Sequence, residues 1–218
     1  MNINDYRPVE SCQIPRLEEF LAEHLGLIND GTFVEVGAFD GKTYSNTYQL
    51  AQLGWTGLYI EPMPHLVISC RENHKNHPNI SIEQAFVSDV DDEIITMCKW
   101  GDNTYTGNFD FIKYVSKFAV TELFEIKAVT LNTLFEEYKI PLHFHLLVID
   151  VEGHEIQVLQ GLDLQLYKPT MIIIETHAES PDFGLSLHAD DIDAYLRFSG
   201  YRLIFADAIN SIYVACDV

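Results

Sequence analysis

Residues 33–41 read Phe-Val-Glu-Val-Gly-Ala-Phe-Asp-Gly, an apolar strand that runs directly into a turn marked by glycines. A second apolar run, Gly57-Leu-Tyr-Ile, follows downstream and ends in Glu61. Glycine lets the backbone approach a ligand where a β-carbon would clash. An acid at the tip of the next strand can accept hydrogen bonds from both hydroxyls of a ribose. Together the two segments predict a nucleoside pocket.

The spacing of the turn differs from the dinucleotide fingerprint, which needs G-x-G-x-x-G and a helix dipole directed at a pyrophosphate. Here the glycines are Gly37 and Gly41, and two acids, Glu35 and Asp40, flank them. Two carboxylates would repel a pyrophosphate, whereas they favour a ligand with positive charge, such as an ammonium or a sulfonium. With Glu61 on the next strand, this pattern predicts S-adenosylmethionine as the ligand.

The composition is that of an ordinary globular protein with an acidic surface. The chain has 218 residues, 47% hydrophobic and 21% charged, which suits one domain with a sizeable core. The net charge of −20 argues against a nucleic-acid backbone or an anionic membrane as a partner, although it can also serve solubility alone. The apolar runs are too short to span a membrane, and residues 1–6 do not resemble a signal peptide. Four cysteines without C-x-x-C spacing fit a reducing, cytoplasmic setting.

Strands and helices are expected to alternate along the chain. Several strands are apolar on both faces, which is typical of a mostly parallel sheet covered by helices on both sides. We expect strands over 32–36, 57–60, 80–88, 146–149, 171–174, 201–206 and 211–216, and helices over 15–28, 44–53, 64–76, 130–138, 154–160 and 189–198. The last two strands are close enough to pair as an antiparallel hairpin. This pattern predicts one α/β domain over 1–218, with a helical extension over 1–30 and an insertion over 94–129.

Two blocks carry a resemblance to a known family. The first continues residues 33–41 through Ser45-Asn-Thr and Gly54-Trp-Thr-Gly-Leu-Tyr-Ile-Glu-Pro. The second reads Ile149-Asp-Val-Glu-Gly-His-Glu-Ile-Gln-Val-Leu-Gln-Gly and is followed by a strand that ends in Glu175. Over roughly residues 31–180 the chain resembles the FkbM-type S-adenosylmethionine-dependent methyltransferases, whose Asp-x-Glu-Gly-x-Glu segment matches the second block.

The resemblance implies a Rossmann-like, seven-stranded sheet of the class I methyltransferase type and O-methylation, commonly of sugars or secondary metabolites. One departure is Asn132, where the family usually has Asp; it bears on capping or substrate contacts rather than on the cofactor. The leading expectation is transfer to a hydroxyl of a sugar in a glycan or glycoconjugate. The alternatives are a lipid-like or polyketide acceptor, and an inactive scaffold that serves in protein binding.

Ligands of an open α/β sheet lie beyond the carboxyl ends of the strands, so each part of the cofactor can be assigned to residues at a strand end. The methionine part is expected near Glu35, and the ribose at Glu61. Ser88 and Asp89 can bond the adenine edge, although a turn or helix cap explains them equally. Phe86 or Met63 would pack on the face of the adenine ring. The predicted cofactor set is Glu35, Gly37, Ala38, Asp40, Gly41, Ser45, Asn46, Glu61, Pro62, Ser88, Asp89 and Asp150.

Methyl transfer to a hydroxyl needs in-line placement and a base or a metal that handles the hydroxyl proton. We expect Asp150 where the reacting groups meet. In one mechanism Asp150, His154 or His177 is the general base, since a histidine titrates in the useful range. In the other, Asp150, Glu175 and His177 bind Mg²⁺ or Mn²⁺, which prefer oxygen-rich ligands.

The insertion over 94–129 is expected to act as an acceptor lid. Trp100 and Tyr105 can stack on a sugar ring or a flat aglycone, and Asn103 can bond hydroxyls. Glu152, just after Asp150, is the remaining predicted substrate contact. The alternative is that the aromatic rings only cover the edge of the sheet.

Overall fold

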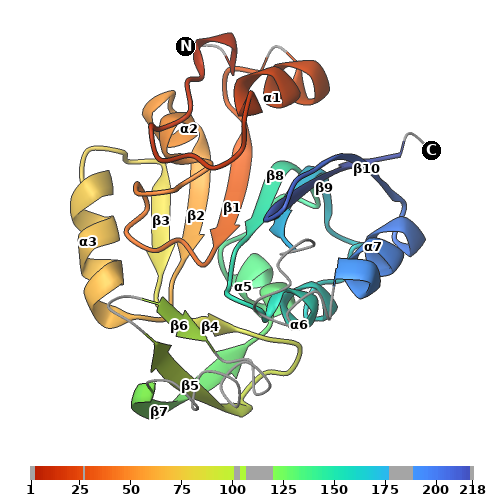
Figure 1. The fold of residues 1–218 in the computed structure, drawn as a ribbon. Helices are drawn as coiled ribbons and strands as arrows, with labels where there is room; N and C mark the ends of the chain where they lie inside the picture. The colour runs from red at the N-terminus through yellow and green to blue at the C-terminus, as the bar shows by residue number, and fades with distance from the viewer. Residues whose placement is uncertain (1–2, 27, 101–103, 107–119, 177–188, 217–218) are drawn as a thin grey trace.

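The computed structural model describes residues 3–26, 28–100, 104–106, 120–176 and 189–216. Its main sheet has seven strands in the order β10-β11-β9-β8-β1-β2-β3 (Figure 1). These strands are β1 Thr32–Val36, β2 Thr56–Ile60, β3 Ile80–Glu83, β8 His143–Ile149, β9 Lys168–Glu175, β10 Tyr201–Ala206 and β11 Asn210–Ala215.

Strand β1 lies at the centre of this sheet, parallel to β2 on one side and to β8 on the other. The chain continues from β2 to β3 in one direction and from β8 to β9 in the other. The strand order therefore reverses between β1 and β8, which is where open α/β sheets form their ligand crevice. Strand β11 pairs antiparallel with both β9 and β10, so the expected α/β sheet with a C-terminal hairpin is confirmed.

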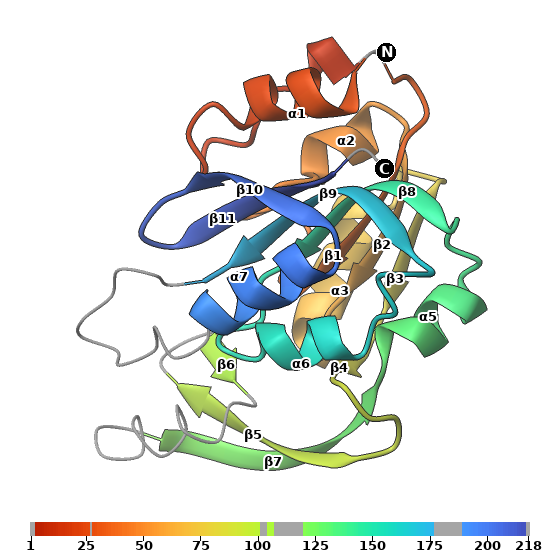
Figure 2. The ribbon, with the colours of Figure 1, turned by 90° about the vertical axis from the view of Figure 1, so that its right-hand side faces the viewer.

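Helices cover both faces of the main sheet (Figure 2). Because successive side chains of a strand point to opposite faces, Val34 and Ile149 pack toward one helical layer while Phe33 and Val148 pack toward the other. The first layer contains α5 Leu131–Glu137, α6 Glu155–Gln160 and α7 Ala189–Phe198. The second contains α1 Leu17–Leu25, α2 Tyr48–Gln52 and α3 Pro64–His74.

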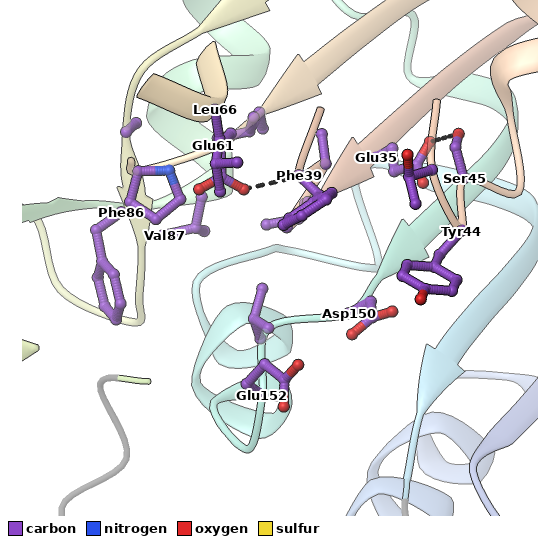
Figure 3. Close-up of a pocket in the computed structure, with 18 of the residues that line it drawn as sticks. Glu35, Phe39, Tyr44, Ser45, Glu61, Leu66, Phe86, Val87, Asp150 and Glu152 are labelled. Atoms are coloured by element: carbon purple, nitrogen blue, oxygen red, sulfur yellow. Dashed lines mark hydrogen bonds between the residues drawn. The ribbon is translucent and has the colours of Figure 1, made fainter. Parts of the chain in front are cut away.

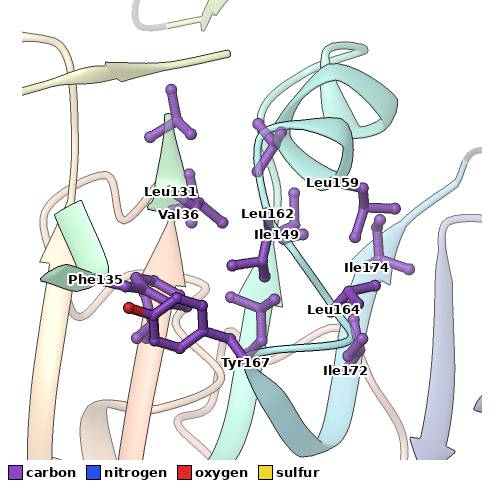
Figure 4. Packing of buried hydrophobic residues seen from close by; sticks show 14 of the residues in the cluster. Val36, Leu131, Phe135, Ile149, Leu159, Leu162, Leu164, Tyr167, Ile172 and Ile174 are labelled. Atoms are coloured by element: carbon purple, nitrogen blue, oxygen red, sulfur yellow. The ribbon is translucent and has the colours of Figure 1, made fainter. Parts of the chain in front are cut away.

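The core beneath α5 and α6 fixes the end of the sheet at which β1 and β8 finish. Val36 and Ile149, the last residues of β1 and β8, are buried there with Leu131 and Leu159 (Figure 4). Burying such side chains stabilises the fold by roughly 2 kcal/mol each. This packing gives the turns that follow the two strands a rigid base.

The expected strand over 80–88 is confirmed for Ile80–Glu83 and wrong beyond it, because the chain leaves the main sheet after Glu83. Residues Phe86–Val87 form a separate strand, β4, which pairs in parallel with the end of β7. A second sheet results, in the order β4-β7-β5-β6. Its other strands are β5 Ile94–Trp100, β6 Thr104–Thr106 and β7 Val120–Val129. Met97 packs with Phe86 in a cluster on one face of this sheet, next to α3.

The first helix after the turn is shorter than the sequence indicates. A helix is expected over 44–53, but α2 begins at Tyr48, because the Ser45 hydroxyl accepts hydrogen bonds from the backbone N–H groups of Thr47 and Tyr48. Side chains that bond nearby backbone in this way compete with helix formation. In the described part of the chain, the helices are all too short or too polar to cross a membrane.

Candidate active site

A cavity of about 430 Å³ lies at the carboxyl ends of β1, β2 and β8 (Figure 3). Its volume is in the range of small-molecule sites. Leu66 and Phe86 lie at one end together with Glu61, whereas Asp150 and Glu152 lie away from them. Of the described residues that line it, none is Lys, Arg or His. The cavity therefore combines apolar and acidic lining residues.

Gly37 makes the close approach of two strand ends possible. Its φ is +80°, and a β-carbon there would stand 1.7 Å from the carbonyl oxygen of Asp150. The Gly37 N–H donates to the carbonyl of Ile60 at 2.9 Å, which joins the turn to β2 as well. Sequence reasoning attributed this glycine to the approach of a ligand. The structure shows that the approach of backbone also requires it, while Gly37 and Ala38 still line the cavity.

Asp40 and Gly41 shape the turn and do not line the cavity. The Asp40 carboxylate accepts hydrogen bonds from the N–H and hydroxyl of Thr43, at 2.6 and 2.8 Å. The Gly41 carbonyl bonds to Nε2 of His74 at 2.7 Å, so this part of the turn faces α3. Both residues were predicted to bind the cofactor, and in the structure they hold the loop whose residues Phe39 and Thr43 line the cavity.

Glu35 is buried at the end of β1 among hydroxyl groups. Its Oε2 accepts a hydrogen bond from Ser45 at 2.9 Å and one from Thr47, whose hydroxyl also lies 2.9 Å from that of Tyr59. Burial raises the pKa of Glu35 to about 7, against the hydrogen bonds from Thr47 and Ser45, and the charge of Asp150 adds to the rise. The contact of Thr47 with Glu35 was not predicted. The only sign of it in the sequence is that two hydroxyl residues, Ser45 and Thr47, stand two positions apart in the segment that follows the turn.

The N-terminal segment holds the same turn from outside. The Tyr6 hydroxyl donates to the backbone carbonyl of Asn46 at 2.9 Å, and the Cys12 thiol lies 3.5 Å from the Asn46 amide oxygen. Ser11 accepts a hydrogen bond from the Tyr44 N–H at 2.8 Å. Asn46, predicted as a cofactor contact, therefore faces the N-terminal segment and does not line the cavity.

Glu61 is fixed by the backbone of two turns. Its Oε2 accepts the N–H of Phe39 and its Oε1 accepts the N–H of Met63, each at 2.9 Å. Burial raises the pKa of Glu61 to about 7, although these backbone bonds oppose the rise. Each carboxylate oxygen retains a further lone pair for a ligand donor. Glu61 and Pro62 both line the cavity.

The Asp-x-Glu-Gly-x-Glu segment forms a tight turn after β8. Glu152 and Gly153 both adopt the left-handed region, with φ of 59° and 94°. The Glu155 carboxylate holds the turn, because it accepts the N–H groups of Val151 and Gly153 at 3.2 and 2.9 Å. Left-handed backbone at a residue other than glycine is costly and clusters at ligand sites. The turn brings Glu152 into the lining of the cavity (Figure 3).

The carboxyl groups around Asp150 raise one another's pKa. Burial raises the pKa of Glu152 to about 8 and that of Glu155 to about 7, and the charge of Asp150 adds to both. Burial and then the Asp150 charge raise the pKa of Glu175 well above its ordinary range, and a hydrogen bond to Asp150 contributes. A positively charged ligand in the cavity would favour the ionised forms of the acids that line it.

Three further residues predicted for the site, Ser88, Asp89 and His154, also lie apart from the cavity lining. Nε2 of His154 and the hydroxyl of Ser88 are 3.0 Å apart, and the His154 ring packs on Phe86 at 5.0 Å between centroids. Asp89 is exposed and accepts a hydrogen bond from Ser88. The base role expected for His154 is therefore not supported by its position. Phe86, expected on the adenine face, does line the cavity.

The predicted lid is described only in part. Trp100 and Tyr105 lie on the paired strands β5 and β6, while Asn103 lies outside the described residues. Met97, in the same insertion, lines the cavity and was missed, because only the pairing of β5 with β7 brings it there. The lid role itself stays a prediction.

The predicted metal set is also described only in part. Asp150 and Glu175 come together, but His177 lies outside the described residues. In the described ranges, no group of three or more His, Cys, Asp or Glu side chains could hold a metal ion. Mg²⁺ or Mn²⁺ binding therefore stays a prediction.

The sheet order, the terminal hairpin and the cavity at the β1–β8 switch point define the fold of a class I methyltransferase. A family model, the methyltransferase FkbM domain, matches residues 35–203. The chain belongs to this family of S-adenosylmethionine-dependent methyltransferases, as the sequence blocks predicted. Among curated proteins, none matches the chain significantly.

Solved structures share this fold at low sequence identity. Precorrin-6y C5,15-methyltransferase from Geobacter metallireducens has a TM-score of 0.54 at 11% identity, with 98% of this chain and 95% of that chain covered. A putative O-methyltransferase from Klebsiella pneumoniae has a TM-score of 0.53 at 12% identity, with coverage of 96% and 84%. At these identities the likeness shows the fold alone.

The residues of the cavity fit S-adenosylmethionine. Leu66 and Phe86 offer apolar surface to an adenine ring, and Glu61 offers acceptors to the ribose hydroxyls. Glu35 and Asp150 are acids whose negative charge would favour the sulfonium and the ammonium of this ligand. The cavity therefore favours a cationic nucleoside over a pyrophosphate.

Proposed function

We propose that this protein transfers a methyl group from S-adenosylmethionine to a hydroxyl of a sugar in a glycan or glycoconjugate. The observation that carries the proposal is the pairing of Glu61 with two carboxylates, Asp150 and Glu152, in one cavity. The first suits a ribose, and the other two can bind and deprotonate a hydroxyl. S-adenosylmethionine supplies an activated methyl group on a positively charged sulfur.

The protein's own groups orient the acceptor and receive its proton. Asp150 or Glu152 takes the hydroxyl proton as the C–O bond forms and the C–S bond breaks, so the positive charge on sulfur and the negative charge of the carboxylate disappear together. Glu152 suits this role, since burial raises its pKa to about 8, near the operating pH of a general base. Glu175 bonds to Asp150 and helps to orient that carboxylate.

The proposal is tested by assaying methyl transfer to a panel of hexoses and sugar nucleotides, with mass spectrometry to locate the methyl group. We expect transfer to oxygen by the wild type. Glu152→Gln should bind S-adenosylmethionine but transfer at most about a hundredth as fast, whereas Asp150→Asn should lose transfer and also bind S-adenosylmethionine more weakly. Glu136→Gln, an exposed acid on α5, is the matched control. Methyl transfer only to lipid-like hydroxyls would show that the acceptor is a lipid-like metabolite and not a sugar. Cofactor binding without any methyl transfer would favour the inactive scaffold.

A further inference from the structure

Tyr44 is an aromatic residue at the cavity that neither the sequence pattern nor the proposed cofactor contacts explain. It lines the cavity and yet is 56% exposed, which is unusual for so large a ring. In Figure 3 the Tyr44 ring is drawn at the same end of the cavity as Asp150, away from Phe86 and Leu66 at the other end. The ring therefore borders the anionic end, where the acceptor would enter.

The backbone of Tyr44 is held in a costly conformation. Its φ is 61°, in the left-handed region, which is a genuine outlier for a bulky aromatic residue. The N–H of Tyr44 donates to Ser11 at 2.8 Å, and the neighbouring Ser45 is bound to Glu35. The N-terminal segment and β1 thus hold the turn by hydrogen bonds on both sides of Tyr44, which keeps the Tyr44 ring at the mouth of the cavity.

The chemistry around the ring suits a carbohydrate. An aromatic face packs on the apolar C–H face of a pyranose ring, and carboxylates accept hydrogen bonds from its hydroxyls. Asp150 and Glu152 are two of the carboxylates that line the same cavity. A smaller hollow, lined by Glu10, Ser11 and Lys42, lies next to this cavity, and Thr43 lines both. The hollow gives room for a further sugar ring.

We propose that Tyr44 is the platform on which the acceptor sugar stacks, with the sugar's hydroxyls directed toward Asp150 and Glu152. This inference rests on the proposed function and names the residue that selects a pyranose acceptor. Stacking on the ring would orient one hydroxyl for transfer, while the methyl donor occupies the cavity beside it. A planar or ring-shaped apolar face on the acceptor is then required for recognition.

The test uses saturation-transfer NMR with a panel of methyl glycosides of common hexoses and the protein saturated with S-adenosylhomocysteine. We expect saturation to be transferred to the ring protons of at least one glycoside, both from the wild type and from Tyr44→Phe, which keeps the aromatic face. Tyr44→Ala should bind that glycoside about tenfold more weakly than the wild type does. Phe198→Ala, which removes an aromatic ring 91% exposed at the end of α7, is the matched control and should bind as the wild type does.

The outcomes separate this inference from the proposed function. Binding of the glycoside by Tyr44→Ala as tightly as by the wild type would overturn the platform, as would the failure of every glycoside to bind the wild type. Weaker binding of S-adenosylhomocysteine by Tyr44→Ala would also overturn it, because the ring would then contact the cofactor. Failure of the wild type to bind S-adenosylhomocysteine would instead sink the proposed function. The thermal midpoint of each variant verifies that it is folded.

Discussion

The carbonyl oxygen of Asp150 occupies the position that a side chain at Gly37 would need: a β-carbon at Gly37 would stand 1.7 Å from it. The end of β8 is therefore seated against the turn that follows β1. This contact joins the two carboxyl ends between which the cavity lies. The glycine that marks the family's turn serves the assembly of the site before any ligand binds.

Gly37→Ala is therefore expected to destabilise the fold by about 4 kcal/mol or to prevent folding, because it combines strained φ with a clash against backbone. Gly54→Ala is the matched control. Gly54 has a φ of +92° but nothing within 4 Å of its added β-carbon, so only the strain remains, at about 1 kcal/mol. Denaturant unfolding measures both. Equal losses in the two variants would show that the Asp150 contact is unimportant.

The buried acids predict that stability falls as pH rises. The pKa values of Glu35 and Glu61 are raised from 4.5 to about 7, and that of Glu152 to about 8. The folded state therefore retains protons that the unfolded state releases, so this contribution is full below pH 4.5 and is lost as pH rises through 7 to 8. The thermal midpoint should therefore fall as pH rises from about 4.5 to about 8. Glu152→Gln should flatten that fall, whereas Glu136→Gln should leave it unchanged.

Glu155 is expected to act through the turn that carries Glu152. Glu155→Ala removes the acceptor for the N–H groups of Val151 and Gly153, and should cost about 2 kcal/mol of folding free energy. Gln160→Ala, at the exposed end of the same helix, should cost less than about 0.5 kcal/mol. Unfolding by urea compares the two. If Glu155→Ala unfolds at the same urea concentration as the wild type, the carboxylate does not hold the turn.

Ser11 is expected to order the turn at Tyr44. Ser11→Ala removes the acceptor of the Tyr44 N–H, so hydrogen exchange at residues 43–46 should become faster. Ser69→Ala removes a serine that bonds only within α3 and should leave that exchange unchanged. Unaltered exchange over 43–46 in Ser11→Ala would mean that the N-terminal segment does not support the turn.

The sequence identified the sheet and the acids because these depend on local patterns. Buried strands read as apolar runs; Glu61 and Asp150 directly follow such runs, and Glu35 lies one residue before the end of one. The hairpin followed from two adjacent apolar runs. The break after Glu83 could not be read, since residues 80–88 are continuously strand-like and only the partner strand β7 draws Phe86 and Val87 into another sheet.

The parts of the site that depend on distant contacts were missed. His154 looked like a base because it follows Asp150, but its ring bonds to Ser88 from a segment far away in sequence. Met97 and Tyr44 enter the cavity through the second sheet and through a turn held by the N-terminal segment. No local period or spacing encodes such contacts, since they arise from tertiary packing.

Calorimetric titration of the wild type and Glu61→Gln with S-adenosylmethionine tests whether Glu61 holds the ribose. We expect micromolar binding by the wild type and binding at least about tenfold weaker in the variant, because a charged acceptor of ribose hydroxyls is lost. Glu83→Gln is the control, since Glu83 ends the neighbouring strand and bonds Tyr138 outside the cavity. Equal affinity of Glu61→Gln and wild type, or no binding by the wild type, would contradict the account.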